Sequence, residues 1–104
     1  MSRIETLKGF LTQDPKDSFS RYALALEYAK LEQFEDARRE LETVKSNDPE
    51  YVATYYQLGQ LYQKMSLPHE AEKTLRTGIL VAGKAGDSHT QSELAAALDA
   101  LLAG

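Results

Sequence analysis

Apolar residues recur at intervals of three and four along most of the chain, a spacing that places them on one face of an α-helix. Near the start, Ile4, Leu7, Phe10 and Leu11 follow this spacing. The same pattern, broken by turn-forming residues, predicts six helices. Their expected ranges are residues 2–12, 17–31, 34–46, 48–65, 68–83 and 87–103. The pattern therefore predicts an all-α protein.

Turn-forming and capping residues mark the helix ends. Asp17 or Ser18 can accept the free N–H groups at the start of the second helix. Asp48 followed by Pro49 predicts the start of the fourth helix, because proline lacks only an N–H group that would be unpaired there. The segment 83–86 contains two glycines and is expected to end the fifth helix.

Two segments of the chain are copies of each other at a spacing of 34 residues, since Asp14-Pro15 recurs as Asp48-Pro49. Behind these dipeptides, apolar and small residues align with their own kind, whereas the charged positions mostly differ. The aligned pairs are Tyr22 with Tyr56, Leu24 with Leu58, Ala25 with Gly59, Tyr28 with Tyr62, Ala37 with Ala71 and Leu41 with Leu75. The packing positions therefore repeat, and a period in this range is typical of helical solenoids.

The aligned residues resemble the tetratricopeptide repeat family. That family has Leu-Gly and Tyr on the first helix of a unit, Ala and a large apolar residue on the second, and then Asp-Pro. The second copy here reads Leu58-Gly59, Tyr62, Ala71 and Leu75. The resemblance covers residues 14–82 and implies a TPR-like α-solenoid, a right-handed stack of antiparallel helix pairs with about six helices. Glu32 and Ser66 depart from the pattern, because the family favours Gly at these turns.

A single domain over residues 1–104 is expected, because about three units of this period are needed for a stable stack. Its parts are a leading half-unit helix, two repeats and a terminal capping helix, at residues 1–13, 14–47, 48–82 and 87–103. Ser88 with Gln91 three residues later matches a capping box for the terminal helix. Small residues are expected where paired helices cross, since overpacking there costs roughly 1–3 kcal/mol. The crossing residues are Ala25 with Ala37 and Gly59 with Ala71.

The resemblance also implies a binding surface, because the first helix of each pair lines the concave face of such a stack. The matching groove residues are Phe19, Tyr22, Leu26, Lys30, Tyr56, Gln60, Gln63 and Lys64. The alternative is that the aromatic residues among them simply pack against neighbouring helices. A subset of the family grips a C-terminal carboxylate with Lys, Arg and Asn on this face. The residues at the matching positions supply no such cations, so this clamp is expected to be absent.

Composition narrows the classes of partner. The net charge is −4, whereas binding to nucleic acid draws on clustered Lys and Arg. The chain has no cysteine and no apolar run of about 18 residues that could span a bilayer. Its first residues include the acid Glu5, unlike a secretory signal. We therefore expect a cytoplasmic protein that binds neither nucleic acid nor membrane.

Catalytic chemistry has little support in the sequence. The only histidines, His69 and His89, are not in a metal-binding spacing, and the glycines form no phosphate-cradling loop. Asp87, Ser88 and His89 are adjacent at a helix start, where their side chains point in different directions and cannot act as a triad. We expect no enzyme activity, no catalytic or metal-binding residue and no cofactor.

Charged residues are densest between Glu32 and Lys45. At helical spacing Glu35 can pair with Arg39, and Arg38 with Glu42, for roughly 0.2–0.5 kcal/mol each. This run is interpreted as a solvated outer face, with an acidic docking surface as the alternative.

The expected function is a protein–protein interaction scaffold or adaptor that binds a peptide or helix segment of another protein in the concave groove. The alternative is a structural self-assembly module, in which exposed aromatic residues meet a second copy of the chain, as in a homodimer. An enzyme would need a polar pocket of which the sequence gives no sign.

Overall fold

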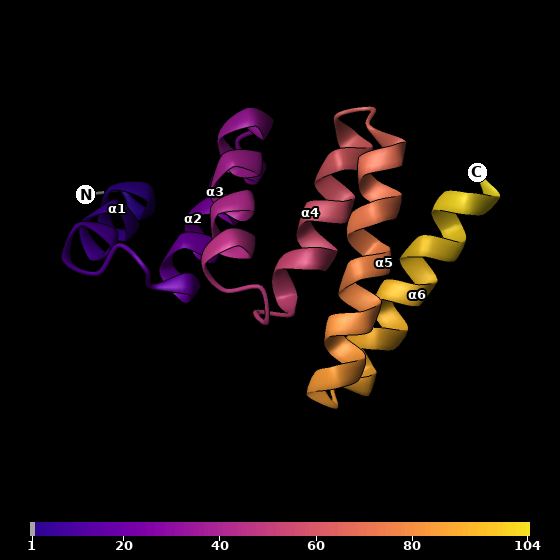
Figure 1. The fold of residues 1–104 in the computed structure, drawn as a ribbon. Coiled ribbons are helices and arrows are strands. Elements are labelled where there is room, and N and C mark those ends of the chain that lie inside the picture. The colour runs from indigo at the N-terminus through magenta and orange to yellow at the C-terminus, as the bar shows by residue number, and fades with distance from the viewer. Residues whose placement is uncertain (1) are drawn as a thin grey trace. The chain divides into compact units, whose positions relative to one another are not determined.

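The computed structural model describes residues 2–104 and is helical almost throughout (Figure 1). Within these residues there are six helices and no strand. The helices are α1 (Arg3–Gln13), α2 (Ser18–Lys30), α3 (Phe34–Asn47), α4 (Ala53–Lys64), α5 (Pro68–Ala85) and α6 (Ser88–Ala103). The prediction of an all-α protein with about six helices is confirmed.

Contacts between the helices divide the chain into two compact units, Met1–Asp48 and Pro49–Gly104. In the first unit, α2 packs against both α1 and α3. In the second unit, α5 packs against both α4 and α6, and α4 also touches α6. Figure 1 shows most plainly for α4 and α5 that paired helices run antiparallel. Each unit therefore holds a complete antiparallel pair and one additional helix, and the single domain stays a prediction.

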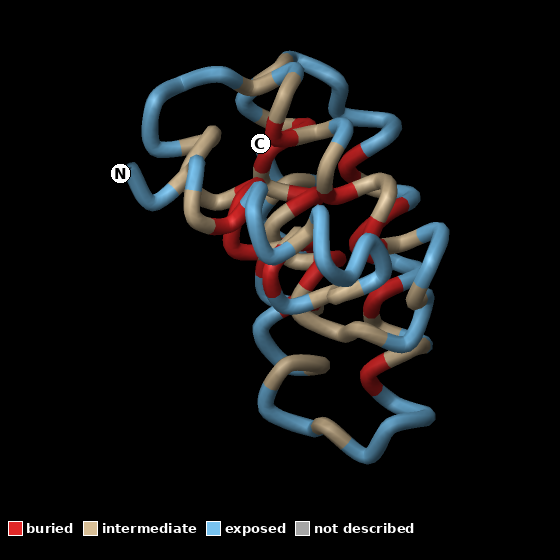
Figure 2. The backbone as a smooth tube through the Cα atoms, turned by 90° about the vertical axis from the view of Figure 1, so that its left-hand side faces the viewer, coloured by how far each residue is buried: buried red, intermediate tan, exposed pale blue. Residues whose placement is uncertain are grey.

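Each unit has its own apolar core. In the first, Leu7 of α1 is buried together with Ala23 and Leu24 of α2. In the second, the buried cluster draws on three helices and consists of Tyr55, Leu75, Ala82, Leu94, Ala97 and Leu98. Buried segments recur between exposed ones along the helices at helical spacing (Figure 2). Half of the second cluster comes from α6, so this helix is part of the core of its unit.

Gly59 lies at a close approach of α4 to α5. A Cβ atom added to Gly59 would lie 2.5 Å from Cδ2 and 2.8 Å from Cγ of Leu75, nearer than van der Waals contact allows. Leu75 is fully buried, so the densely packed core leaves it little room to move. Ala25, Ala37 and Ala71 are also fully buried. These positions agree with the expectation that small residues occupy the helix crossings.

We expect Gly59→Leu to lower the melting temperature far more than Gln60→Leu at the next position. The new side chain at residue 59 would overlap Leu75, and overpacking of this kind costs roughly 1–3 kcal/mol, whereas Gln60 is half-buried. Thermal melts followed by circular dichroism would measure the difference. Equal losses in the two variants would contradict the contact assigned to Gly59.

The turns after α2 and α4 share a left-handed backbone. Glu32 has a φ of 60° and Ser66, 34 residues later, a φ of 61°. In both turns, the amide of the following residue donates to a carbonyl in the last helical turn, that of Tyr28 at 2.9 Å and that of Tyr62 at 2.8 Å. Glycine adopts this conformation without steric cost. Both copies therefore keep the backbone that favours Gly, although neither carries Gly.

The fourth helix begins later than the sequence pattern predicts. The Asp48-Pro49 dipeptide indicates a helix start, but α4 begins at Ala53, and Pro49 lies in a turn before it. Asp48 lies too far before Ala53 to cap α4, and its carboxylate accepts a hydrogen bond from Ser18 Oγ at 2.9 Å. The dipeptide thus marks the turn between α3 and α4 rather than the first turn of a helix.

The carbonyl of each repeat's proline, Pro15 or Pro49, accepts a hydrogen bond from a side chain on the helix that follows. The donor stands at the same repeat position in both copies but is a different residue. Arg21 Nη2 donates to the carbonyl of Pro15 at 2.8 Å. Tyr55, 34 residues further on, donates its hydroxyl to the carbonyl of Pro49 at 2.5 Å. Arg21 also forms an ion pair with Glu40 at 2.7 Å. Both copies therefore have a hydrogen bond from the helix to the turn. The donor is a guanidinium in the first copy and a phenol in the second.

The fifth helix continues past its predicted end. Gly83 is helical, α5 ends at Ala85, and the chain turns at Gly86, which has a φ of 74°. An added Cβ at Gly83 would lie 2.7 Å from Nε2 of Gln91, so the end of this long side chain lies over the glycine. Gly83 is thus an exposed helical residue under the Gln91 side chain, and the helix stop belongs to Gly86.

The predicted capping box at the start of α6 does not form. Asp87, rather than Ser88, caps the helix by accepting the backbone N–H of Thr90 at 3.0 Å. Ser88 is already the first helical residue, and the side chain of Gln91 turns to the preceding helix, where its Nε2 donates to the carbonyl of Ile79 at 3.3 Å. Gln91 therefore makes a hydrogen bond to α5 and not the predicted bond within the first turn of α6.

Thr54, in the first turn of α4, is fully buried, and its hydroxyl has no hydrogen-bond partner among the described residues. Its equivalent in the first copy, Ser20, is also buried but donates its hydroxyl to Asp17 at 2.6 Å. Tyr51 occupies the position equivalent to Asp17, so the second copy lacks the acceptor. Leaving a buried polar group unpaired costs about 1–3 kcal/mol.

Thr54→Val is expected to raise the free energy of unfolding by about 1 kcal/mol, because a methyl group of similar shape replaces the unpaired hydroxyl. Ser20→Ala is the matched change in the first copy and is expected to lower it, since it removes the bond to Asp17. Urea unfolding of the parent and both variants would measure these effects. A destabilised Thr54→Val protein would show that the hydroxyl has a partner, such as an ordered water molecule.

Candidate functional site

One exposed face of α2 carries the predicted groove residues of the first unit. Phe19 is 64% exposed, Tyr22 and Leu26 are half-buried, and Lys30 is exposed. Their spacing of three or four residues places them along one side of α2, away from the buried Leu24. We call Phe19, Tyr22, Leu26 and Lys30 the α2 strip. It combines an apolar surface with a cation at one end, 3.1 Å from the carboxylate of Glu27.

Of the two caps that the sequence allows, Asp17 and Ser18, it is Asp17 that fixes the start of the helix carrying the α2 strip. Its carboxylate accepts the Ser20 hydroxyl at 2.6 Å and the Ser20 backbone N–H at 3.2 Å. These hydrogen bonds, led by the one from the hydroxyl, hold the pKa of Asp17 below its ordinary value of 3.8. Because the folded state lowers this pKa, Asp17 stabilises the fold above that value, and the contribution is lost as the pH falls through the folded-state pKa.

Asp17→Asn is expected to keep the capping hydrogen bond at the start of α2 but to remove the ionisable carboxyl group. The melting temperature at pH 7 should change little, whereas its decrease between about pH 5 and pH 2 should be smaller than in the parent, since Asn accepts hydrogen bonds without ionising. Asp17→Ala should lose about 1 kcal/mol already at pH 7. Melts across this pH range would measure both. An unchanged acid profile in Asp17→Asn would assign the acid sensitivity to other carboxylates.

The predicted residues of the second unit lie on α4 and are more polar. Tyr56 is half-buried and packs against the core cluster of its unit. Its hydroxyl accepts a hydrogen bond from Gln60 Nε2 at 3.0 Å. Gln63 is half-buried and Lys64 is exposed. We call Tyr56, Gln60, Gln63 and Lys64 the α4 strip.

The structure thus brings the eight predicted residues together as two strips, one in each unit. For Tyr56 the alternative interpretation holds in part, because its ring contributes to core packing. Phe19, in contrast, is among the most exposed large apolar residues. Whether the two strips bind one ligand as a single groove stays a prediction.

The charged run on α3 is paired largely within itself. Arg38 forms ion pairs with Glu35 and, at 2.7 Å, with Glu42. Arg39 pairs with Asp36 at 2.6 Å, rather than with Glu35 as the spacing suggests. The hydrogen bond from Arg38 lowers the pKa of Glu35, and the same bond raises that of Arg38. Because its charges are internally compensated, α3 has the character of a solvated face more than of an acidic docking surface.

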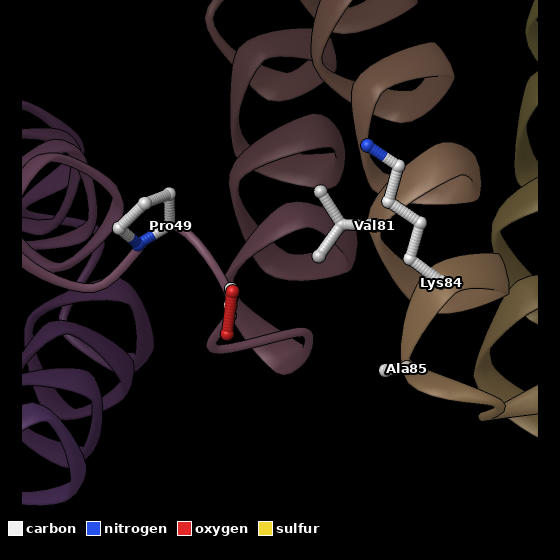
Figure 3. Close-up of a pocket in the computed structure, with 5 residues that line it drawn as sticks. Pro49, Val81, Lys84 and Ala85 are labelled. Carbon is white, nitrogen blue, oxygen red and sulfur yellow. The ribbon is translucent and has the colours of Figure 1, made fainter.

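A small open cleft of about 260 Å³ lies in the second unit (Figure 3). Pro49 and Glu50, from the segment before α4, line one side, and the last turns of α5 line the other with Val81, Lys84 and Ala85. The sequence gives no signal for this cleft, because its two sides are more than 30 residues apart and the repeat pattern that includes Pro49 predicts only a turn there.

Features typical of other classes of site are not found in the part of the chain that the structure describes. Over residues 2–104, no group of three or more His, Asp or Glu side chains is placed to hold a metal ion. His89 lies 3.7 Å from the carboxylate of Glu93 in an exposed contact. None of the described helices combines the length and apolar composition that crossing a membrane requires.

Comparison with known families gives two adjacent matches to a tetratricopeptide repeat model, over residues 20–51 and 52–84. The chain belongs to the tetratricopeptide repeat family. The two matches overlap the two repeats predicted from the sequence. No curated protein is significantly similar to the whole sequence.

Solved structures of the same family are similar to this chain. A tetratricopeptide repeat domain protein from Salinibacter ruber is 40% identical, with a TM-score of 0.81 over 85% of this chain and 89% of its own. A protein from Bordetella parapertussis is 27% identical, with a TM-score of 0.84 over 98% of this chain and 89% of its own. The TPR2B domain of yeast Sti1, in a complex with pHsp70, is 16% identical with a TM-score of 0.88, over 94% of this chain and 78% of its own. The last similarity concerns the fold alone.

Proposed function

We propose that this tetratricopeptide repeat protein is a non-catalytic scaffold that binds a peptide or helix segment of another protein along the α2 and α4 strips, as an adaptor in the cytoplasm. Tetratricopeptide repeats generally mediate protein–protein interactions. The fold therefore supports protein binding as the class of function. The two strips support a binding surface on α2 and α4 that combines apolar and polar side chains.

The observation that carries the proposal is the exposure of Phe19 beside the half-buried Tyr22 and Leu26. An aromatic side chain buries about 150–250 Å² when it is fully covered, worth a few kcal/mol at ~25 cal/mol per Å². Micromolar binding requires about 8 kcal/mol. Two or three such side chains, with polar contacts, are enough for an affinity of this order.

Polar groups on the α4 strip complement this apolar surface. Gln60 and Gln63 offer donors and acceptors to the backbone of a bound segment, while Lys30 and Lys64 stand at the ends of their strips as exposed cations. The partner that fits these groups is a short segment with apolar anchors and an acidic residue.

The structure of yeast Sti1 offers a comparison, because its TPR2B domain has this fold and is bound to pHsp70. A grip on a terminal carboxylate needs a cluster of cations on the ligand-facing helices. The central positions here are Tyr22, Leu26, Tyr56 and Gln60, none of which is cationic. We therefore propose recognition of apolar side chains in the segment, rather than of its terminal carboxylate.

Selection from a library of displayed random peptides on the immobilised full chain would test the proposal. Enriched peptides should share apolar residues and an acid, and synthetic versions should bind with micromolar dissociation constants measured by fluorescence anisotropy. Tyr22→Ala with Tyr56→Ala should weaken binding at least about tenfold, because each substitution removes an anchor of more than 1 kcal/mol. Circular dichroism should show a folded double variant.

Leu80→Ala serves as the matched control, because Leu80 is 69% exposed on α5 and belongs to neither strip. It should leave the affinity unchanged. A folded double variant that binds the selected peptides as tightly as the parent would place the site elsewhere. A parent chain that selects no peptide but forms a dimer disrupted by the tyrosine substitutions would instead support self-assembly through the strips.

A further inference from the structure

The outward face of α5 carries the cations of that helix around an exposed leucine. Lys73, Arg76 and Lys84 are exposed. Leu80, between the last two, is 69% exposed, more than any other large apolar residue that the structure describes. Successive positions are three or four residues apart, so all four share one side of the helix. We call Lys73, Arg76, Leu80 and Lys84 the basic patch.

The basic patch is exposed because α5 uses its opposite side for packing. Helix α5 contacts both α4 and α6, the helices that precede and follow it in the second unit. At the buried Gly78, an added Cβ would lie 2.5 Å from Cβ of Tyr55 on α4 and 3.1 Å from Cδ1 of Leu94 on α6. Both neighbours in the unit are therefore in place, and they leave the basic patch uncovered.

The charges of the basic patch are only partly compensated. Within the described residues, neither Lys73 nor Lys84 forms an ion pair. Arg76 pairs with Glu72 at 3.0 Å, in a contact that leaves 55% of the Arg76 side chain exposed. The acids of α5, Glu70 and Glu72, lie in its first two turns, and no acid follows them in the helix. The later part of the patch therefore presents unpaired positive charge.

One end of the basic patch is concave. Lys84 also lines the open cleft of about 260 Å³, together with Val81 and Ala85 (Figure 3). Pro49 and Glu50 form the other side of this cleft. A chain that passes Lys84 can therefore enter the cleft, where the carboxylate of Glu50 offers an acceptor to a backbone N–H group.

We propose that the basic patch binds a short, extended acidic segment of another protein, in which an apolar residue stands between two acids. Arg76, Leu80 and Lys84 follow one another at about 6 Å along the helix axis. Alternate residues of an extended chain lie about 6.6 Å apart and point to the same side. An apolar side chain can thus cover Leu80 while the acids two residues before and after it meet Arg76 and Lys84.

The size and surroundings of the basic patch favour a protein segment over nucleic acid or a membrane. The patch is about 16 Å long, and Glu50 and Glu70 lie beyond its two ends. The residues of the second unit include more acids than cations. A phosphate backbone or a bilayer extends well past the patch and would meet these acids, whereas a segment of about five residues contacts the cations alone.

This surface shares no residue with the α2 and α4 strips, so the proposal goes beyond the function proposed for them. It also adds a second partner class, because the strips offer mainly apolar and hydrogen-bonding groups, whereas the basic patch selects acids. Binding here is expected to weaken with salt, since its charge pairs are exposed to solvent.

Fluorescence anisotropy of the full chain with a labelled peptide would test the proposal. In the peptide, leucine stands between two glutamates, with one serine on each side of the leucine. The peptide should bind saturably at low salt, and at least about fivefold more weakly at 200 mM than at about 20 mM NaCl. Leu80→Ala should weaken binding at least about fivefold. A peptide with serine in place of the leucine should bind the parent and Leu80→Ala equally, because the apolar contact is then already missing.

Charge exchange tests the ion pairs. Arg76→Glu with Lys84→Glu should abolish binding of the glutamate peptide and should bind a peptide with lysines in its place, which the parent does not bind. Lys8→Glu with Lys16→Glu is the matched control, because it changes the net charge equally at exposed cations of the first unit. It should bind the glutamate peptide like the parent, as should Tyr22→Ala with Tyr56→Ala. Circular dichroism should show that every variant is folded.

Several results would overturn the proposal. One is a parent that does not bind the glutamate peptide at low salt, and another is equal loss in the two charge-reversed variants. Binding that is lost in Tyr22→Ala with Tyr56→Ala but kept in Leu80→Ala would place the peptide on the α2 and α4 strips, in support of the proposed function. Binding to phosphatidylserine vesicles but not to the peptide, abolished by Arg76→Glu with Lys84→Glu, would identify a membrane surface as the partner.

Discussion

The close crossing of paired helices is the constraint on which each unit depends. Gly59 leaves no room for even a methyl group against Leu75, and both residues are in the interior of the second unit. Ala25 and Ala37 are as deeply buried in the first. Once two helices approach this closely, their large apolar side chains interdigitate on either side of the crossing, and a third helix can cover the remaining apolar face.

The two copies meet the same structural requirements with different chemistry. Arg21 and Tyr55 tie equivalent turns to their helices, one through a guanidinium that also pairs with Glu40, the other through a phenol that joins the apolar core. The exchange has consequences nearby. The second copy has a larger apolar cluster, but its buried Thr54 lacks the acceptor that Ser20 has in Asp17.

The two strips also differ in chemistry. The α2 strip is apolar and exposed, whereas Tyr56 on α4 contributes its ring to the core and shares its hydroxyl with Gln60. Repeated positions in this chain therefore do not have identical roles. The first unit exposes apolar side chains on its strip, and the second exposes hydrogen-bonding groups.

The sequence by itself determined the helices, their pairing and the small residues at the crossings, because these depend on local periodicity and on a repeat that can be counted. It also offered Asp17 and Ser18 as alternative caps for the second helix, and the structure chose Asp17. Only the tertiary structure decided the exceptions. The helix expected at Asp48-Pro49 begins only at Ala53, while Asp48 bonds to Ser18, and Gln91 reaches α5 instead of closing a capping box. A local motif predicts a local bond only when no residue distant in the sequence competes for the same side chain.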